Sequence, residues 1–388
     1  MKNWLSYINK QKSEYRHTQL PTEHRVDMVV VIPCYNEPDV MTTLQSLLRS
    51  ASPEISCMVA VIINSGEHAG QHAVEQNRKT MSEIQQFSEQ HSRKEMQIVP
   101  LLFENLPKKH AGVGLARKIG MDLAVEYFYQ MQNERGIIVS LDADCTVSDN
   151  FLANIHRAFK HNDKQNATIH NFLHRAENND PTIEKAVRQY ETHIRTFSNR
   201  LKEIGFPSYY HTIGSAFAVS ADAYVRAGGM GRQQAGEDFY FLQKVFALGN
   251  VTLLEDVFVY PMARFSDRVP FGTGPALQKI IDEQHNSLKT YSTQSFEELK
   301  RFFDRKDSFF KTEKSTIQSS IIDLHPALHL FIEDNHILEA IEDCNRNCAT
   351  IQSFQKRFFH HFNAFMIIKF LNFVHPNHFE KEPIVEIT

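Results

Sequence analysis

The sequence predicts an α/β protein with a doubly wound, mainly parallel (Rossmann-like) sheet and a helical C-terminal extension. Four apolar runs rich in β-branched residues are separated by segments with helical periodicity, and such continuous runs are typical of parallel strands covered on both faces. From about residue 276 onward the pattern is mainly helical and rich in Phe and His. The predicted strands are DMVVVIP (27–33), CMVAVII (57–63), QIVPLLF (97–103) and IIVSL (137–141).

The segments between these runs predict the helices that cover the sheet. After the first strand, Val40, Leu44 and Leu47 share one face of a helix. A polar helix near 70–92 and a further helix near 114–133 follow the second and third strands. Strands that alternate with helices in this way bind ligands at their carboxyl ends. We therefore expect the functional residues at that edge of the sheet.

Beyond the fourth strand the pattern changes to a long polar helix followed by two more strands. Asp180 is a suitable N-cap and Pro181 a suitable first residue for that helix. The segment 211–220 predicts a strand, 237–250 a helix that Gly249 closes, and 251–261 a return to the sheet. This order continues the α/β pattern into the second half of the chain.

The length and charge of the chain limit its organisation and its partners. With 388 residues, the chain can form a catalytic domain of about 250 residues and an appendage. We expect an N-terminal helical segment over 1–25, a catalytic domain over 26–275 and a helical region over 276–388, with homo-oligomer formation left open. The formal net charge of -4 argues against nucleic acid as a partner, because phosphate backbones bind clustered Lys and Arg.

Cysteine usage and hydropathy indicate a cytoplasmic protein. The five cysteines are odd in number and form no C-x-x-C pair, which predicts reduced thiols and no zinc site. The N-terminus lacks the apolar core of a signal peptide, and no run of about eighteen apolar residues predicts a transmembrane span. The most apolar segment, FNAFMIIKFLNFV (362–374), is interpreted as a buried helix. Docking on a membrane surface is the alternative for this segment.

Two acids follow the fourth predicted strand, in the sequence LDADC. In extended backbone, Asp142 and Asp144 point to the same side of the chain, because side chains alternate along a strand. Two such carboxylates repel each other unless a cation lies between or beyond them. A hard divalent ion that takes other ligands from water and a diphosphate fits this arrangement. The alternative is an ordinary polar turn, in which Asp is common.

The first two strands also end in polar residues. The sequence PCYNEPD can offer a ring face and polar atoms to a nucleoside, and INSGE places an amide at the neighbouring strand end, where it could contact the edge of a base. A capped turn between strand and helix is the alternative at both ends. The residues concerned are Pro33, Tyr35, Asn36, Glu37, Asn64 and Ser65.

A basic, glycine-containing stretch precedes the helix predicted near 114–133. Its glycines allow close approach of the backbone, and its cations together with the helix N-terminus favour a diphosphate. The stretch lacks the G-x-x-x-x-G-K-[ST] pattern of a P-loop. A solvated basic loop is the alternative. The residues are Lys108, Lys109, Gly112, Gly114, Arg117 and Lys118.

Two further segments could act on a substrate. Glu237 and Asp238 open a predicted helix, whose positive end stabilises a carboxylate that could accept the proton of an acceptor hydroxyl. Helix capping explains these acids equally well. The loop 261–275 carries Arg264 and Arg268 and could bring a cation over a phosphate, although an ordinary connection is the alternative.

Taken together, these segments resemble the pattern of family 2 glycosyltransferases of the GT-A fold. The resemblance covers about residues 26–262 and rests on the order and spacing of five weak motifs. These motifs are VVVIPCYNEPD, GVGLARKIGMDLA, LDADCTVSDNF, HTIGSAFAVSADAYVRAGGM and GEDFYFLQKV.

The resemblance implies an enzyme of carbohydrate biosynthesis that transfers a sugar from a nucleoside-diphosphate sugar to a hydroxyl acceptor with inversion. It implies that Asp144, with Asp142, binds Mn²⁺ or Mg²⁺ and that Asp238 is the base, with Glu237 orienting the acceptor or assisting the site. The metal and the basic residues would stabilise charge on the departing nucleoside diphosphate. The implied donor-binding residues are Pro33, Tyr35, Glu37, Asn64, Arg117, Asp142 and Arg268.

Two departures from the family pattern refine this hypothesis. INSGE stands where many members have an acidic stretch, so Asn64 supplies no carboxylate for recognition of uridine. The chain also lacks a Q-x-x-R-W sequence after the base, which favours a single addition over processive synthesis. The alternatives are a nucleotidyltransferase that makes a sugar nucleotide, which PCYNEPD disfavours because it is acidic, and a non-catalytic binding module of the same fold.

Overall fold

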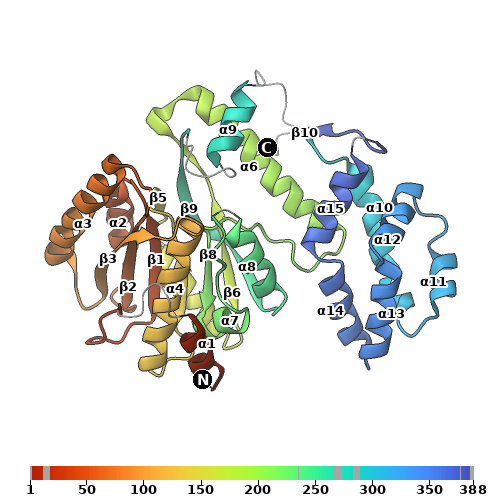
Figure 1. The fold of residues 1–388 in the computed structure, drawn as a ribbon, viewed down its shortest axis with the longest axis horizontal. Helices are drawn as coiled ribbons and strands as arrows, with labels where there is room; N and C mark the ends of the chain where they lie inside the picture. Colours follow the sequence, from red (N-terminus) through yellow and green to blue (C-terminus); the bar gives the residue numbers. More distant parts are fainter. Residues whose placement is uncertain are drawn as a thin grey trace. The chain divides into compact units, whose positions relative to one another are not determined.

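The computed structural model describes residues 2–11, 18–234, 236–265, 273–282, 289–375 and 377–384 (Figure 1). The chain divides into two compact units. The first unit comprises Met1–Val187 and Thr212–Gln278, and the second comprises Arg188–His211 and Lys279–Thr388. The division after Gln278 lies close to the boundary predicted at residue 276. The assignment of 188–211 to the second unit was not anticipated by the linear division.

A single mixed sheet forms the centre of the first unit. The strand order is β3-β2-β1-β4-β8-β6-β9-β5, and β7 pairs with β9. Strands β1 to β4 pair in parallel, and β8 and β5 run antiparallel to their neighbours. The predicted fold class is therefore confirmed. The strands are β1 (Met28–Cys34), β2 (Cys57–Gly66), β3 (Met96–Leu106), β4 (Ile137–Ser140), β5 (Cys145–Val147), β6 (Ala167–Phe172), β7 (Arg175–Ala176), β8 (Phe217–Ser220) and β9 (Val251–Ala263).

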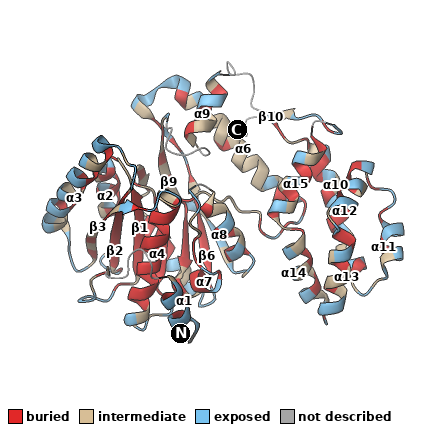
Figure 2. Cartoon of the chain, viewed as in Figure 1, coloured by how far each residue is buried: buried red, intermediate tan, exposed pale blue. Residues whose placement is uncertain are grey.

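Helices cover both faces of this sheet. The core on one face joins strand residues to buried side chains of α2, α3 and α5. On the other face, a Cβ at Gly120 of α4 would overlap the side chains of Val31 and Ile62, so α4 lies directly on β1 and β2. Phe217 and Phe241 place α8 on that same face, with ring centroids 5.9 Å apart. Figure 2 shows α4 buried along most of its length.

Except for α1 and α9, the helices of the first unit connect these strands, and α6 and α9 continue into the second unit. They are α1 (Lys2–Gln11), α2 (Val40–Arg49), α3 (Gln71–His91), α4 (Val113–Gln130), α5 (Phe151–His161), η1 (Glu177–Asn179), α6 (Pro181–Glu203), α7 (Ala221–Arg226), α8 (Glu237–Phe246) and α9 (Thr273–Asp282).

Strands β5 and β7 were not predicted, and two further strands differ from the prediction for local reasons. The predicted strand 211–220 is a strand only over Phe217–Ser220, because Gly214 lies in the turn that passes Arg117 and Asp238. Strand β6 was not predicted, because Thr168 and His170 interrupt its apolar pattern. Both side chains are nevertheless fully buried, and they hydrogen-bond each other at 3.1 Å.

The second unit is helical and has a core rich in phenylalanine. Rings of α10 pack on rings of α14, as in the 5.2 Å contact between Phe303 and Phe359. The segment predicted as a buried helix is α15, in which Ile367, Phe370 and Leu371 are buried. The elements are α10 (Thr293–Asp304), η2 (Lys306–Phe309), α11 (Lys314–Ser320), α12 (Pro326–Asp334), α13 (Ile337–Asn347), α14 (Ile351–His361), α15 (Ala364–Val374), β10 (Lys289–Thr290) and β11 (Glu382–Pro383).

Within the described ranges, no helix has both the length and the apolar character needed to cross a membrane.

Candidate active site

The acids predicted from the sequence gather at the carboxyl edge of the sheet, in the first unit. Strand β8 is antiparallel to both β4 and β6, so β6 runs in the same direction as β4. Because β1 is parallel to β4 and β9 is parallel to β6, the strands β1, β4 and β9 all run in the same direction. Their ends therefore lie at one edge, as parallel topology requires. Two arginines, one from α4 and one after β9, organise the carboxylates there into two clusters.

The first cluster, called the Arg117 cluster, consists of Arg117, Asp142, Glu237 and Asp238. The side chain of Arg117 is 3% exposed; its Nη2 donates to Asp142 Oδ1 at 2.6 Å and its Nη1 donates to Glu237. The side chain of Glu237 is also 3% exposed. Burial would lower the pKa of Arg117, but the charges of Asp142, Glu237 and Asp238 raise it above its ordinary value. The guanidinium therefore remains a permanent cation beneath the sheet edge.

Two glycines allow the elements of this cluster to meet. A Cβ at Gly214 would lie 2.9 Å from both Arg117 Nη2 and Asp238 Oδ2, so the backbone before β8 passes directly beside both charges. A Cβ at Gly114 would overlap the carbonyl oxygen of Gln233, so the first turn of α4 touches the segment that leads to α8. Side chains at either position would separate the arginine from its partners.

Asp238 has the electrostatic properties of a general base. Burial, together with the charge of Glu237, raises the pKa of Asp238 to about 6, although Arg117 and the backbone N–H of Phe239 oppose this shift. The Phe239 N–H donates to Asp238 Oδ1 at 2.7 Å and fixes the carboxylate at the first turn of α8. A base with a pKa near the working pH is efficient, because it is deprotonated yet still accepts a proton readily.

The second cluster, called the Arg264 cluster, joins Glu37 after β1, Asp144 after β4 and Arg264 after β9. Arg264 Nη1 donates to Glu37 Oε1 at 3.3 Å, and Nη2 pairs with the other oxygen of Glu37. Nη2 also lies 3.4 Å from Asp144 Oδ2. Burial would lower the pKa of Arg264, but its hydrogen bond to Glu37 and the charges of Glu37 and Asp144 raise it.

The structure separates the two acids of the LDADC sequence. Strand β4 ends at Ser140, and a turn follows in which the Cys145 N–H donates to the carbonyl of Asp142 at 3.2 Å. The extended geometry assumed from the sequence is therefore not present. Asp142 pairs with Arg117, whereas Asp144 pairs with Arg264.

The residues fit a divalent ion that shares its ligands with a substrate. Among the described residues, no group of three or more His, Cys, Asp or Glu side chains could hold a metal alone. The carboxylates of Asp142 and Asp144 are 35% and 28% exposed, so they can bind a cation from the solvent side. Mg²⁺ is held in this way, by one or two carboxylates with water and phosphate oxygens.

The two clusters together carry an excess of acid over base. Five carboxyl groups adjoin two guanidinium groups, so the edge has a surplus of negative charge even when Asp238 is protonated. This balance favours a diphosphate only when a cation accompanies it. The carboxyl groups are those of Glu37, Asp142, Asp144, Glu237 and Asp238.

The remaining predicted donor-binding residues lie at the ends of β1 and β2. Pro33 is buried opposite Ile62, and Tyr35 is half-buried directly after β1. Asn64 is 2% exposed, and its amide donates to the carbonyl of Cys34 at 3.0 Å, which joins the two strand ends. The side chain of Asn64 therefore has little exposed surface with which to contact a nucleotide base. Arg268 lies outside the described residues.

Lys118 does not belong to the edge. Its Nζ donates to Asp122 Oδ2 at 2.8 Å, and both side chains are nearly fully buried. The expectation that this cation faces a diphosphate is therefore wrong, whereas its neighbour Arg117 does reach the site. The sequence did not predict that Glu37 pairs with Arg264. The signal for this pair was that Arg264 follows the predicted strand 251–261, which ends at the same edge of the sheet.

The chain resembles known proteins in fold alone. No family model matches the chain, and no curated protein sequence matches it. Among solved structures, the crystal structure of S. aureus TarS 1-349 in complex with UDP-GlcNAc matches at 11% identity and a TM-score of 0.42, covering 86% of this chain and 91% of that chain. The complex of TarS 1-349 with UDP matches at 12% identity and a TM-score of 0.39, covering 89% and 90%.

Proposed function

We propose that this chain is a glycosyltransferase that moves a sugar from a nucleoside-diphosphate sugar to an acceptor hydroxyl. The observation that carries the proposal is the Arg117 cluster. It brings Asp238, a carboxyl group of raised pKa, beside the Arg117 guanidinium and beside Asp142, which follows the parallel strand β4. Stabilisation of the fold alone would not require a third acid here, because Arg117 is already paired with Asp142 and Glu237. The ordered motifs of the sequence support the same function.

In this proposal the donor binds at the ends of β1 and β4. Tyr35 offers a partly exposed ring to the nucleoside, and Asp144, with Asp142, would hold Mn²⁺ or Mg²⁺ against the diphosphate. When bound, that ion neutralises charge on the diphosphate as it leaves. Arg117 keeps Asp142 in place, and Arg264 balances Asp144 and Glu37.

Asp238 accepts the proton of the acceptor hydroxyl in the proposed reaction. The acceptor oxygen forms a bond to the anomeric carbon of the sugar while the bond from that carbon to the diphosphate oxygen breaks, and the nucleoside diphosphate leaves with the electron pair. Attack on the side opposite the leaving group inverts the anomeric carbon. Glu237 stays paired with Arg117 and thereby orients the first turn of α8.

The test combines donor binding with turnover. A thermal-shift panel of UDP-, GDP- and dTDP-sugars, with and without Mn²⁺, should show stabilisation by one nucleotide class, because a ligand that binds the folded state raises Tm. Asp144→Ala should abolish the part of the shift that depends on metal. Asp238→Asn should retain the shift but lose donor hydrolysis and transfer by about 10²–10⁴-fold.

Asp149→Ala is the matched control, because Asp149 is an exposed acid only five residues after Asp144. It should behave as the wild type in both assays. Full metal-dependent binding by Asp144→Ala, or full turnover by Asp238→Asn, would contradict the proposed roles.

A further inference from the structure

We infer that Tyr7, on the N-terminal helix α1, is a positioning residue for Asp238. It acts through two structures that it touches, the helix α4 and the segment Gly229–Gln234. The inference rests on the proposed function, because it assigns Asp238 as the base. The contacts that support it all lie within the first unit.

A buried carboxylate joins α1 to α4 and α7. Asp122 of α4 is 5% exposed. Its Oδ1 accepts from the hydroxyl of Tyr7 at 2.7 Å and from the hydroxyl of Tyr224 at 2.8 Å, while its Oδ2 accepts from Lys118. A buried charge is stable only with such partners. Tyr7 is therefore the residue through which α1 joins this group.

The hydroxyl of Tyr7 also lies against the backbone of Gly229. A Cβ at Gly229 would overlap Tyr7 Oη and would lie 2.8 Å from Tyr7 Cζ. Gly229 has a φ of +74°, which a residue with a side chain adopts only with strain. Both features restrict this position to glycine and leave it in direct contact with α1.

The other end of the segment is held by the loop before α4. Gln234 Nε2 donates to the carbonyl of Lys108 at 3.0 Å and to that of Ala111 at 3.3 Å. The carbonyl of Gln233 packs on Gly114. The segment Gly229–Gln234 is thus fixed by Tyr7 at its start and by the loop before α4 at its end, and Asp238 follows four residues later.

The second route runs through α4 itself. Lys118 faces the buried Asp122, and its neighbour Arg117 faces Asp142 and Glu237. A shift of α4 that follows loss of the Tyr7 hydrogen bond therefore also moves Arg117. Displacements of about 1 Å can reduce a rate by about 10²-fold, because reacting groups must be held in a near-attack geometry.

The experiment compares two substitutions on the same helix in the full-length chain. Tyr7→Phe removes only the hydroxyl. The control Trp4→Phe removes the hydrogen bond from Trp4 Nε1 to Asp222 on α7 at 3.3 Å together with part of a buried ring, and so tests whether loss of any contact of α1 has the same effect. Tyr7→Phe should lower kcat for donor hydrolysis about tenfold with little change in KM for the donor, and Trp4→Phe should leave both constants unchanged. Equal kcat losses in the two variants, or none in either, would overturn the inference.

Hydrogen exchange provides a measurement independent of activity. In the wild type, amides of Gly229–Gln234 should exchange as slowly as those of α1, since the two are docked together. In Tyr7→Phe, exchange over this segment should be at least about tenfold faster. If the amides of Gly229–Gln234 and those of α1 exchange at different rates in the wild type, the inference is overturned, even if the variant does not fold. If wild type turns over no nucleotide sugar, the proposed function fails while this measurement still tests the docking.

Discussion

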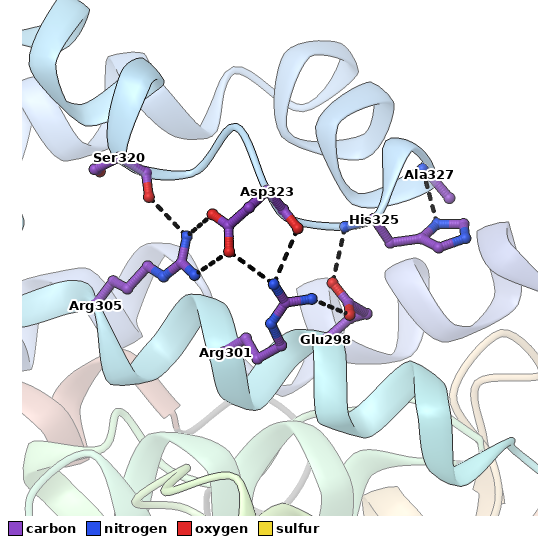
Figure 3. Close-up of polar contacts among 7 residues, drawn as sticks. All are labelled: Glu298, Arg301, Arg305, Ser320, Asp323, His325 and Ala327. Carbon is purple, nitrogen blue, oxygen red and sulfur yellow. Dashed lines mark hydrogen bonds and ion pairs between the residues drawn. The ribbon is translucent and has the colours of Figure 1, made fainter.

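Two arginine–carboxylate networks, one in each unit, have similar geometry but lie in different surroundings. In the first unit, Arg117 contacts Asp142 at 2.6 Å, and the arginine side chain is 3% exposed. In the second, Arg305 contacts Asp323 at 2.6 Å, and the arginine side chain is 26% exposed. Figure 3 shows this network. Arg301 binds the same aspartate and Glu298.

The comparison shows that the contact distance of an ion pair does not by itself indicate how much the pair contributes to stability. Exposed pairs are screened by water and salt, so they add little to stability. Buried pairs do not necessarily stabilise the fold either, but removal of one partner leaves an uncompensated charge in the interior. The Arg117 network therefore links folding to the site, whereas the Arg301 and Arg305 network holds surface segments together.

The largest effect is expected for Arg117→Met. This change leaves Glu237 buried without its cation and should lower the free energy of unfolding by about 3–5 kcal/mol, as well as abolish turnover. Urea unfolding measures the stability. Arg305→Met in the second unit is the control and should have a much smaller effect. Similar losses in the two variants would contradict the comparison.

A smaller effect is expected for Asn64→Ala. The change leaves the buried carbonyl of Cys34 without the amide that donates to it, and should lower the free energy of unfolding by about 1–3 kcal/mol. Donor affinity, measured by titration calorimetry, should remain unchanged. Loss of donor affinity without loss of stability would instead support the base-binding role predicted from the sequence.

Asp238→Asn should increase stability in a manner that depends on pH. The pKa of Asp238 in the folded chain, about 6, exceeds that of an unfolded Asp, about 3.9. Between these values the folded state binds more protons, so the wild type loses stability as pH rises through 6.

The advantage of Asp238→Asn over wild type should therefore grow from near zero at pH 4 to about 1–2 kcal/mol above pH 6, less than the full shift because the side chain is partly exposed. Urea unfolding at a series of pH values measures it, with Asp149→Asn as control. A difference that does not change with pH would contradict the raised pKa.

The smallest effect is expected for Asp323→Asn. Hydrogen bonding to Arg305 lowers the pKa of Asp323, so its contribution is present above the pKa of an unfolded Asp and is lost as pH falls below it. Because the aspartate is exposed, the change in the free energy of unfolding, measured by urea unfolding, should be the smallest of the series and should shrink further at high salt. A loss comparable to that of Arg117→Met would show that exposure does not distinguish the two networks.

The sequence by itself determined the parallel part of the sheet and the edge at which the acids lie. The apolar runs of β1 to β4 carry their own periodicity, and parallel strands bring their carboxyl ends to one edge. Asp142 and Asp144 were therefore located at this edge without knowledge of any contact, whereas Glu237 and Asp238 were identified as the first turn of a helix. The resemblance to a family contributed their expected roles.

Only the tertiary structure decided which charges pair. Arg117 and Lys118 are neighbours in the sequence, yet one reaches Glu237 and the other Asp122, because successive residues of a helix point in different directions. Glu37 and Arg264 are 227 residues apart, and no local pattern relates them. Local periodicity identifies elements and faces, whereas partners across the chain depend on the way in which those elements pack.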